Sequence, residues 1–340
     1  MDMTEREIGE LRLYNQFITN RRDQSRVVQS LCGLQAQYEK EALSSLSLRT
    51  TETSIQCAPL VKCWTLRGTI HVIHETDLPV FLHTGSLSRY AEEQWRECSS
   101  IPMDRKIFFA DLILEALREG NCTRDALKNR CGEKGMSEAE SRAYFFNPWG
   151  GIIRYLVETG RICYLVGNRS PTYAPAPPFV PLGHDAAWEI IVDRYFSTFG
   201  PATMRDASYF LGKSQRFIQK HMAVDGLKSA QCDKKTYFYK GDAAGKDAPA
   251  CILLPAFDPL LMAFFKEDSP FFERENIRNI YSLTGIVYPT VMVRGKIVAR
   301  WKRKGSKIHI APFRSLPAKE KTLIEKTIGD RGAGDVVWEE

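Results

Sequence analysis

The residues best suited to chemistry in this sequence are two glutamines, Gln35 and Gln37, which flank Ala36 in the segment GLQAQYEKEA. In a helix their side chains would diverge, because residues two positions apart do not share a face. In an extended segment they would project to the same side, and Gly33 favours a helix break just ahead of them. Two parallel amides can offer acceptors and donors to one small ligand or to a water molecule. On composition alone, two glutamines on a polar surface need no functional explanation.

Signatures of the common enzyme classes are missing from the sequence. It contains no H-E-x-x-H, P-loop, G-x-S-x-G or G-x-G-x-x-G motif. His71 and His74 lie three positions apart in an expected strand, where alternation points them to opposite faces. The nine cysteines include no C-x-x-C spacing, which argues against a zinc knuckle or a disulfide scaffold. We therefore expect neither a metal nor a cofactor.

Composition indicates a globular protein with a full core. The chain has 340 residues, of which 44% are hydrophobic and 11% aromatic, enough for two or three domains. No run approaches the roughly 18–20 apolar residues needed to span a bilayer, so a membrane partner is not expected. The N-terminus MDMTEREIGELR lacks the features of a signal peptide. These features predict a cytoplasmic, nucleoid-associated protein in a reducing environment.

The positive charge is concentrated in one segment. The net charge is +6, but the stretch from Asn276 to Lys319 holds ten basic residues and no Asp or Glu, and the remainder has 37 basic against 41 acidic residues. Such a surface is typical of a protein that binds a polyanion, although a charged hairpin can also be merely solvated. Basic and apolar residues alternate in VARWKRK, and the predicted phosphate contacts there are Arg300, Lys302, Arg303 and Lys304.

Helices and hairpins recur in the order of a winged helix. In the first clear copy, helices over 105–120, 122–132 and 147–160 precede a hairpin over 161–175, with Thr123 and Asn147 as expected N-caps. In the second copy, helices over 185–200, 202–212 and 214–223 precede a hairpin that turns at Asp233-Lys234. The N-terminal region allows the same interpretation, with helices over 12–19, 25–33 and 40–49 and a strand pair over 62–74.

We therefore predict an α+β fold of tandem winged-helix modules with a C-terminal β-rich basic segment. The expected modules are 1–100, 101–180, 181–248 and 249–340, with breaks at Pro171–Pro181 and at 240–249. In the last module a strand is followed by Asp258 as a helix N-cap, then strands joined at Arg294-Gly295 and Lys304-Gly305, and a terminal helix over 318–328. A helical array that packs only on itself is the alternative fold.

Five segments together resemble one family. GLQAQ, WTLRGTIHVI, FGPATMRDASYFLG, LLPAFDPLL and YPTVMVRGKIVARWKR occur in the order and spacing found in AlkZ/YcaQ-like winged-helix DNA glycosylases, which remove alkylated bases and unhook crosslinks. The resemblance covers roughly residues 11–328. The family carries a catalytic Q-Φ-Q or Q-Φ-D signature, and the first form falls on Gln35-Ala36-Gln37. The resemblance thus implies that Gln35 and Gln37 are the catalytic residues.

The resemblance also implies a substrate and a DNA-facing hairpin. An N7-alkylated purine is already cationic and leaves without protonation, so the enzyme needs mainly to place water and to stabilise charge on the sugar. The hairpin TLRGTIHVI would lie at the DNA side, with Arg67, Thr69 and His71 as nucleic-acid-binding residues. Thr69 could equally be structural, and His71 could be a buried, hydrogen-bonded histidine. The cap role of Asp258 explains its presence without a catalytic function.

The expected partner is double-stranded DNA with alkylated bases or crosslinks, bound by a monomer without metal. The competing interpretation is a non-catalytic winged-helix protein that serves as a regulator or a scaffold. A regulator would bind one sequence far better than random DNA, whereas a glycosylase would leave abasic sites in alkylated DNA.

Overall fold

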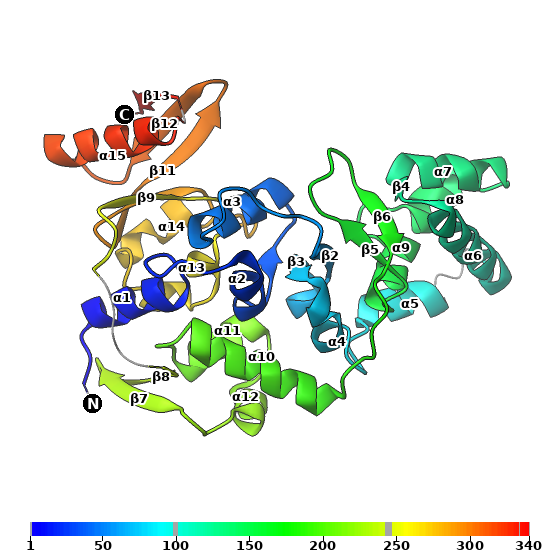
Figure 1. Ribbon diagram of the computed structural model, residues 1–340, viewed down its shortest axis with the longest axis horizontal. Coiled ribbons are helices and arrows are strands. Elements are labelled where there is room, and N and C mark those ends of the chain that lie inside the picture. The colour runs from blue at the N-terminus through cyan, green and yellow to red at the C-terminus, as the bar shows by residue number, and fades with distance from the viewer. Residues whose placement is uncertain (1, 98–100, 242–246, 333, 340) are drawn as a thin grey trace. The chain divides into compact units, whose positions relative to one another are not determined.

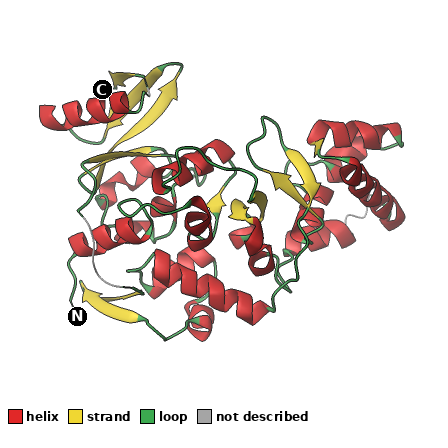
Figure 2. Cartoon of the chain, viewed as in Figure 1, coloured by secondary structure: helices red, strands yellow, loops and turns green. Residues whose placement is uncertain are grey.

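The computed structural model describes residues 2–97, 101–241, 247–332 and 334–339, and helices and strands alternate along them (Figures 1 and 2). The chain divides into two units, each assembled from distant segments. The first comprises Met1–Leu34, Lys40–Ile55 and Val192–Glu340, and the second comprises Gln35–Glu39 and Gln56–Ile191. The predicted α+β class is confirmed. The finer division into modules at residues 100, 180 and 248 stays a prediction, and residues 242–246 of the expected break at 240–249 lie outside the described residues.

A six-stranded sheet forms the centre of the second unit. Its spatial order is β1-β3-β2-β5-β6-β4. The strands are β1 (Leu34–Gln35), β2 (Leu60–Trp64), β3 (Ile70–His74), β4 (Cys122–Thr123), β5 (Ile162–Leu165) and β6 (Thr172–Pro175). The expected hairpins β2-β3 and β5-β6 are both present, and β2 pairs with β5, so two predicted wings share one sheet. This pairing satisfies the backbone groups of an edge that either hairpin alone would expose. The first part of the segment Pro171–Pro181, where a break was expected, is β6.

Six helices belong to the described part of the second unit. They are α4 (Leu78–Phe81), α5 (Arg89–Glu97), α6 (Met103–Glu119), α7 (Arg124–Glu133), α8 (Glu138–Glu140) and α9 (Gly151–Glu158), with short turns η1 (Leu66–Gly68), η2 (Glu75–Asp77) and η3 (Ser141–Phe145). Of these helices, α6, α7 and α9 contact the six-stranded sheet. The Thr123 hydroxyl accepts a hydrogen bond from the N–H of Ala126, which confirms the predicted cap of α7. The end of α9 is also as predicted, since Gly160 follows it with φ +70°.

The predicted start of α9 at Asn147 is wrong. The helix begins at Gly151, and the side chain of Asn147 instead accepts a hydrogen bond from the N–H of Trp149 in a local turn. Gly150 and Gly151 have φ values of +109° and +47°, and a Cβ on Gly151 would lie 1.6 Å from the carbonyl oxygen of Tyr144. The close approach of η3 therefore requires glycine there, and no helix can pass through those dihedral angles.

The first unit contains the N-terminal helices, a three-helix segment with its hairpin, and a second sheet. Its helices are α1 (Glu5–Asn15), α2 (Gln24–Ser30), α3 (Glu39–Arg49), α10 (His184–Thr198), α11 (Met204–Leu211), α12 (Gln215–His221), α13 (Pro259–Met262), α14 (Ile277–Ile280) and α15 (Ala318–Asp330), with short turns η4 (Lys266–Asp268) and η5 (Arg274–Asn276). Both α3 and α10 begin in segments assigned to the second unit. The helix expected over 12–19 is wrong in its second half, because α1 ends at Asn15 and Phe17 has φ +64°.

The winged-helix order is clearest after α10. Ser214 caps α12 by accepting from the N–H of Phe217, and the hairpin of β7 (Lys228–Cys232) and β8 (Lys235–Tyr239) follows. Asp233 and Lys234 both have positive φ, +47° and +63°, as a tight two-residue hairpin turn requires. The prediction of this turn is confirmed.

The C-terminal sheet has the order β13-β12-β11-β10-β9. Its strands are β9 (Cys251–Leu254), β10 (Thr290–Val293), β11 (Lys296–Lys304), β12 (Lys307–Pro312) and β13 (Asp335–Trp338). The turns at Arg294-Gly295 and after Lys304 are as predicted. The parallel strand β13 was not expected. Ile324 and Ile328 of α15 pack with residues of β10, β11 and β12 in one hydrophobic cluster, so this helix covers one face of the sheet.

A buried ion pair joins α3 to α13 in the first unit. The guanidinium of Arg49 donates to both carboxylate oxygens of Asp258, at 2.9 and 2.6 Å, and both side chains are fully buried. Ser45 also donates to Asp258, which in turn accepts from the N–H of Leu260. The predicted cap role of Asp258 is thus confirmed, and the carboxylate has a second structural role that the sequence did not suggest.

Candidate active site

The backbone holds the two glutamines in an extended segment. Helix α2 ends at Ser30, and Cys32 and Gly33 turn the chain with φ values of +56° and +83°. The N–H of Ala36 then donates to the carbonyl of Ile70 at 2.8 Å, which fastens the segment to β3. The helix break predicted at Gly33 is therefore present, and the motif lies at the edge of the six-stranded sheet.

The amide side chains of Gln35 and Gln37 lie side by side. Nε2 of Gln35 donates to Oε1 of Gln37 at 3.3 Å, while Ala36 points into the core with 1% of its surface exposed. Gln35 is half-buried and Gln37 is exposed. This is the arrangement expected for alternate residues of an extended strand. One lone pair of the Gln37 oxygen and its amide hydrogens remain directed away from this bond, where a small molecule can approach.

Arg67 completes a short chain of polar groups. It lies in the turn η1 with φ +55°, and its Nη2 donates to Oε1 of Gln35 at 3.3 Å. Because a guanidinium can only donate, the Gln35 atom that faces it must be the oxygen. The amide nitrogen of Gln35 must then face Gln37. A positive charge thus polarises the Gln35 amide, and the order Arg67, Gln35, Gln37 is fixed by donor and acceptor chemistry.

A buried arginine supports the turn that carries Arg67. Arg154 of α9 pairs with Glu158 at 2.6 Å and lies over the Trp64 ring at 4.1 Å. A Cβ on Gly68 would lie 3.3 Å from Nη2 of Arg154, so the glycine allows the turn to rest on this guanidinium. Arg154 was not among the residues predicted from the sequence. Its signal there is an arginine four positions before a glutamate in the largely apolar helix GIIRYLVE.

The other two residues of the predicted hairpin have structural contacts. Thr69 is half-buried, and its hydroxyl donates to the carbonyl of Leu66. His71 is 3% exposed, with Nδ1 2.9 Å from the hydroxyl of Thr65 and 3.2 Å from the carbonyl of Thr69. Burial and the charge of Arg67 lower the pKa of His71 to about 3. These contacts agree with the interpretation of His71 as a buried, hydrogen-bonded residue and do not favour its direct contact with DNA.

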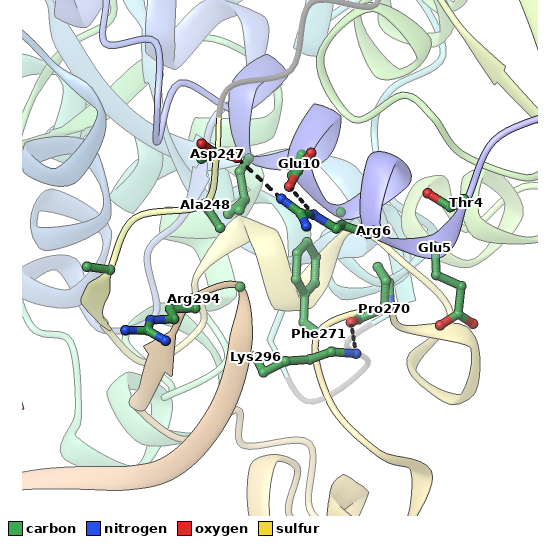
Figure 3. Close-up of a pocket in the computed structure, with 14 residues that line it drawn as sticks. Thr4, Glu5, Arg6, Glu10, Asp247, Ala248, Pro270, Phe271, Arg294 and Lys296 are labelled. Atoms are coloured by element: carbon green, nitrogen blue, oxygen red, sulfur yellow. Dashed lines mark hydrogen bonds and ion pairs between the residues drawn. The ribbon is translucent and has the colours of Figure 1, made fainter. Parts of the chain in front are cut away.

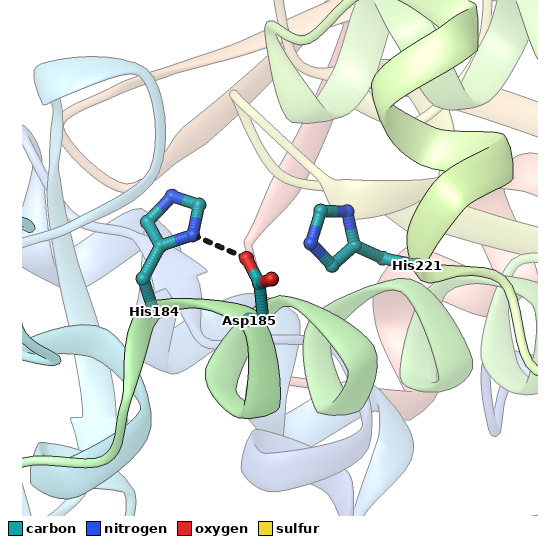
Figure 4. Close-up of side chains that lie close together, drawn as sticks. All are labelled: His184, Asp185 and His221. Carbon is teal, nitrogen blue, oxygen red and sulfur yellow. Dashed lines mark hydrogen bonds and ion pairs between the residues drawn. The ribbon is translucent and has the colours of Figure 1, made fainter.

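Thiols and imidazoles are the side chains that enzymes commonly use as nucleophiles or metal ligands, and the following ones lie outside the glutamine motif and are buried or hydrogen-bonded. Burial raises the pKa of the Cys131 thiol to about 12 and that of Cys163 to about 11, so neither is a thiolate nucleophile near neutral pH. At the start of α10, Nδ1 of His184 lies 2.9 Å from Oδ1 of Asp185 (Figure 4). Nδ1 of His74 lies 2.8 Å from the hydroxyl of Thr76. The absence of a metal from the mechanism stays a prediction.

The basic strand β11 presents its cations unequally. Arg300 lies over the Tyr288 ring at 5.0 Å, and Lys302 pairs with Glu339 at 2.7 Å. Arg303 and Lys304 are exposed, and within the described residues neither side chain has an ion pair. Trp301 packs against the core and donates to the carbonyl of Leu254. Among the predicted phosphate contacts of this strand, Arg303 and Lys304 are therefore the two without an ion pair or ring contact in the described residues.

Comparisons with known proteins identify the family of this chain. The family described as DNA glycosylase AlkZ-like matches residues 28–333. The chain belongs to this AlkZ-like family. It is 24% identical to the "Interstrand DNA cross-link repair glycosylase" of Streptomyces sahachiroi, over 91% of this chain and 90% of the relative. The solved structure of Streptomyces sahachiroi DNA glycosylase AlkZ has a TM-score of 0.77 at 21% identity, with both chains covered completely.

An AlkZ-like protein is a DNA glycosylase, an enzyme that hydrolyses the N-glycosidic bond between a base and its sugar. The predicted family and enzyme class are thereby confirmed, and a non-catalytic regulator or scaffold is not supported. The structural likeness to AlkZ also agrees with the predicted α+β class. Among the described residues, no helix combines the length and apolar character needed to cross a membrane.

Proposed function

We propose that this AlkZ-like enzyme excises N7-alkylated purines from double-stranded DNA and unhooks interstrand crosslinks, with Gln35 and Gln37 as its catalytic residues. The relative from Streptomyces sahachiroi is named for crosslink repair. A crosslink formed through N7 of two purines contains the same cationic base on each strand. One active site can therefore process both the monoadduct and the crosslink, provided that it admits the second strand.

The leaving group determines what the enzyme must provide. An N7-alkylated purine carries a positive charge, so the electron pair of the C1′–N9 bond neutralises the base as that bond breaks. Water adds to C1′, and its proton passes to the solvent. The transition state resembles an oxocarbenium ion, as in glycoside hydrolysis. The enzyme needs to position water and stabilise positive charge on the sugar, and amide oxygens can serve both purposes without an acid.

The observation that carries this proposal is the alignment of the Gln35 and Gln37 amides, joined at 3.3 Å. Gln37 is the exposed member and has an acceptor site for the attacking water. Gln35 is held between Arg67 and Gln37, and so it fixes the direction in which the Gln37 oxygen points. The two glutamines therefore have separate tasks, with Gln37 in contact with water and Gln35 orienting it.

Duplex DNA is held by cations outside the catalytic pair. Arg67 is exposed beside Gln35 and suits a contact with phosphate or a groove. Arg303 and Lys304 supply unpaired charge at the end of β11. Arg300 and Lys302 belong to the same strand, although the charge of Lys302 is offset by Glu339. Thr69 keeps the hairpin turn in shape.

The test is base release from DNA that contains N7-methylguanine, followed by alkaline cleavage at the abasic site. We expect release by the native enzyme and its loss in Gln35→Ala/Gln37→Ala. The matched control is Gln29→Ala/Gln56→Ala, which removes two glutamines outside the motif. Native-rate release by Gln35→Ala/Gln37→Ala would refute the catalytic assignment. Absence of release by the native enzyme from both a monoadduct and a crosslinked duplex would refute the proposed substrate class.

A further inference from the structure

Acidic side chains lie among the basic ones in one cavity of the first unit. This cavity, of about 840 Å³, lies between α1, the loop before β9 and the turn between β10 and β11 (Figure 3). Arg6 forms ion pairs with Glu10 and Asp247, and Lys296 donates to the carbonyl of Pro270. Its acids thus offset much of its positive charge, and it offers little attraction for an anion.

A second cavity in the same unit is lined by basic residues and by no acidic ones. It has a volume of about 400 Å³, and the titratable residues that line it are Arg21, Arg303 and Arg331. No Asp or Glu is among its lining residues. Within the described part of the chain, none of the three guanidiniums has an ion pair or a hydrogen-bond partner. Three positive charges therefore share one concave surface without any neutralising group.

The three arginines come from separate elements. Arg21 precedes α2, Arg303 lies near the end of β11, and Arg331 follows the last turn of α15. The backbone next to Arg21 is held by two hydrogen bonds, because Arg22 donates to the carbonyl of Arg49 and accepts from the N–H of Thr51. The cluster is thus formed by the tertiary structure and is not the local consequence of one charge run.

The cluster has an electrostatic cost in the absence of an anion. Desolvation lowers the pKa of Arg331, and the neighbouring charge of Arg21 lowers it further. The C-terminus of α15 favours a cation, but this explains one of the three arginines and not their convergence. A bound anion would remove the mutual repulsion, and the planar donor groups of arginine match the oxygens of a phosphate.

The other residues that line this second cavity restrict the kind of ligand that it can bind. Ser44 and Ser47 of α3 form one side of the cavity, with their hydroxyls donating to carbonyls of their own helix. Trp301 also lines it, but its Nε1 is occupied by the carbonyl of Leu254. The guanidiniums are therefore the main donors available, which suits a charged phosphate better than a neutral polar ligand.

We propose that Arg21, Arg303 and Arg331 form a pocket that binds a backbone phosphate of the duplex. This proposal rests on the proposed function, since it assumes that the polyanion is the DNA substrate. It adds Arg21 and Arg331 to the DNA-binding residues, neither of which belongs to the acid-free segment 276–319. It also assigns Arg303 a defined phosphate site, whereas Lys304 remains a general positive charge at the strand end.

The experiment compares two double variants of the full chain on undamaged duplex DNA over a range of salt concentrations. In Arg21→Gln/Arg331→Gln we expect the slope of log Kobs against log salt concentration to fall by about 0.9, the value for one lost phosphate contact. The matched control, Lys321→Gln/Lys326→Gln, removes the same charge from exposed positions of α15 outside both the cavity and the acid-free segment. We expect the control to keep the native slope.

The possible outcomes separate this proposal from its alternatives. An unchanged slope in Arg21→Gln/Arg331→Gln, or an equal loss in both double variants, would overturn it. A rise in Tm with inorganic phosphate that is lost in Arg21→Gln/Arg331→Gln, together with a native DNA slope, would assign the pocket to a small free anion and also overturn it. Because the variant relieves repulsion, we expect its Tm in low salt to be at least that of the native protein.

Failure of the proposed function can be recognised independently. If the native enzyme releases no N7-methylguanine but the slopes differ as expected, the phosphate pocket stands and the substrate assignment fails. If release is normal and the slopes are equal, the substrate assignment stands and the pocket fails.

Discussion

Nη2 of Arg67 donates to Oε1 of Gln35 at 3.3 Å, across 32 positions of sequence. Through this bond a residue of the β2-β3 turn determines which atom of Gln35 faces Gln37. Arg67 therefore has two separable roles, since its charge can attract DNA and its hydrogen bond orients an amide. A substitution that keeps the charge but changes the geometry distinguishes them.

We predict that Arg67→Ala lowers both kcat for base release and the affinity for duplex DNA. A hydrogen bond from a charged donor contributes about 1.5–3 kcal/mol, so kcat should fall about 10- to 100-fold. Arg67→Lys should recover most of the affinity and little of kcat, because the ammonium lacks the planar fork. Single-turnover kinetics with N7-methylguanine DNA measure kcat, and fluorescence anisotropy measures affinity. Equal recovery of both by Arg67→Lys would contradict a positioning role.

The end of β11 should contribute a sequence-independent part of DNA binding. Arg303→Gln/Lys304→Gln is expected to weaken binding for all sequences alike and to reduce the salt slope by about 1.8, for two phosphate contacts. Lys302→Gln should have a smaller effect, because the charge of Lys302 is offset by Glu339. Titrations on two unrelated duplexes test both points. A native slope in Arg303→Gln/Lys304→Gln would place the DNA surface elsewhere.

Asp258 should matter for folding and not for chemistry. Asp258→Asn leaves the guanidinium of Arg49 buried without a counter-charge, which costs about 3–5 kcal/mol in the free energy of unfolding. The asparagine oxygen can still cap α13. Urea denaturation measures the loss, and Glu267→Gln, which removes the carboxylate of an exposed pair with Arg274, should have little effect. A stability close to that of the native protein would show that the buried pair is not required.

His71 should make the free energy of unfolding depend on pH in the acidic range. Its pKa is about 3 in the folded protein and about 6.5 when the chain is unfolded. Between these values the unfolded state binds the additional proton, so the free energy of unfolding falls as pH decreases from about 6.5 toward 3. The contribution of one such group approaches about 1.4 kcal/mol for each pH unit.

Denaturant titrations at pH 7.5, 6 and 5 in His71→Asn and in the native protein measure this dependence. We expect His71→Asn to be less stable than the native protein at pH 7.5, where the native hydrogen bonds are intact, and to lose less stability on acidification. The same pH dependence in both proteins would mean that His71 does not titrate on unfolding in this range.

Several elements could be predicted because their signals are local. Thr123, Ser214 and Asp258 cap helices through oxygens that reach backbone N–H groups a few positions ahead. The turn at Asp233-Lys234 and the strand alternation of β11 depend on neighbouring residues in the same way. The local signal failed at Asn147, because the close approach of the preceding turn η3 to Gly151 forces the glycine turn that begins α9.

The sequence alone therefore determined the glutamine motif, the helix break at Gly33 ahead of it and the segment that holds the surplus of positive charge. Each depends on residue type and on spacing along a few positions. Only the tertiary structure decided which charges are free, since Glu339 offsets Lys302 while Arg21 and Arg331 join Arg303 in a cavity without acids. Likewise, it brought Arg67 to Gln35 and Asp258 to Arg49. Electrostatic pairing depends on distance in space, and a sequence read along the chain does not contain that distance.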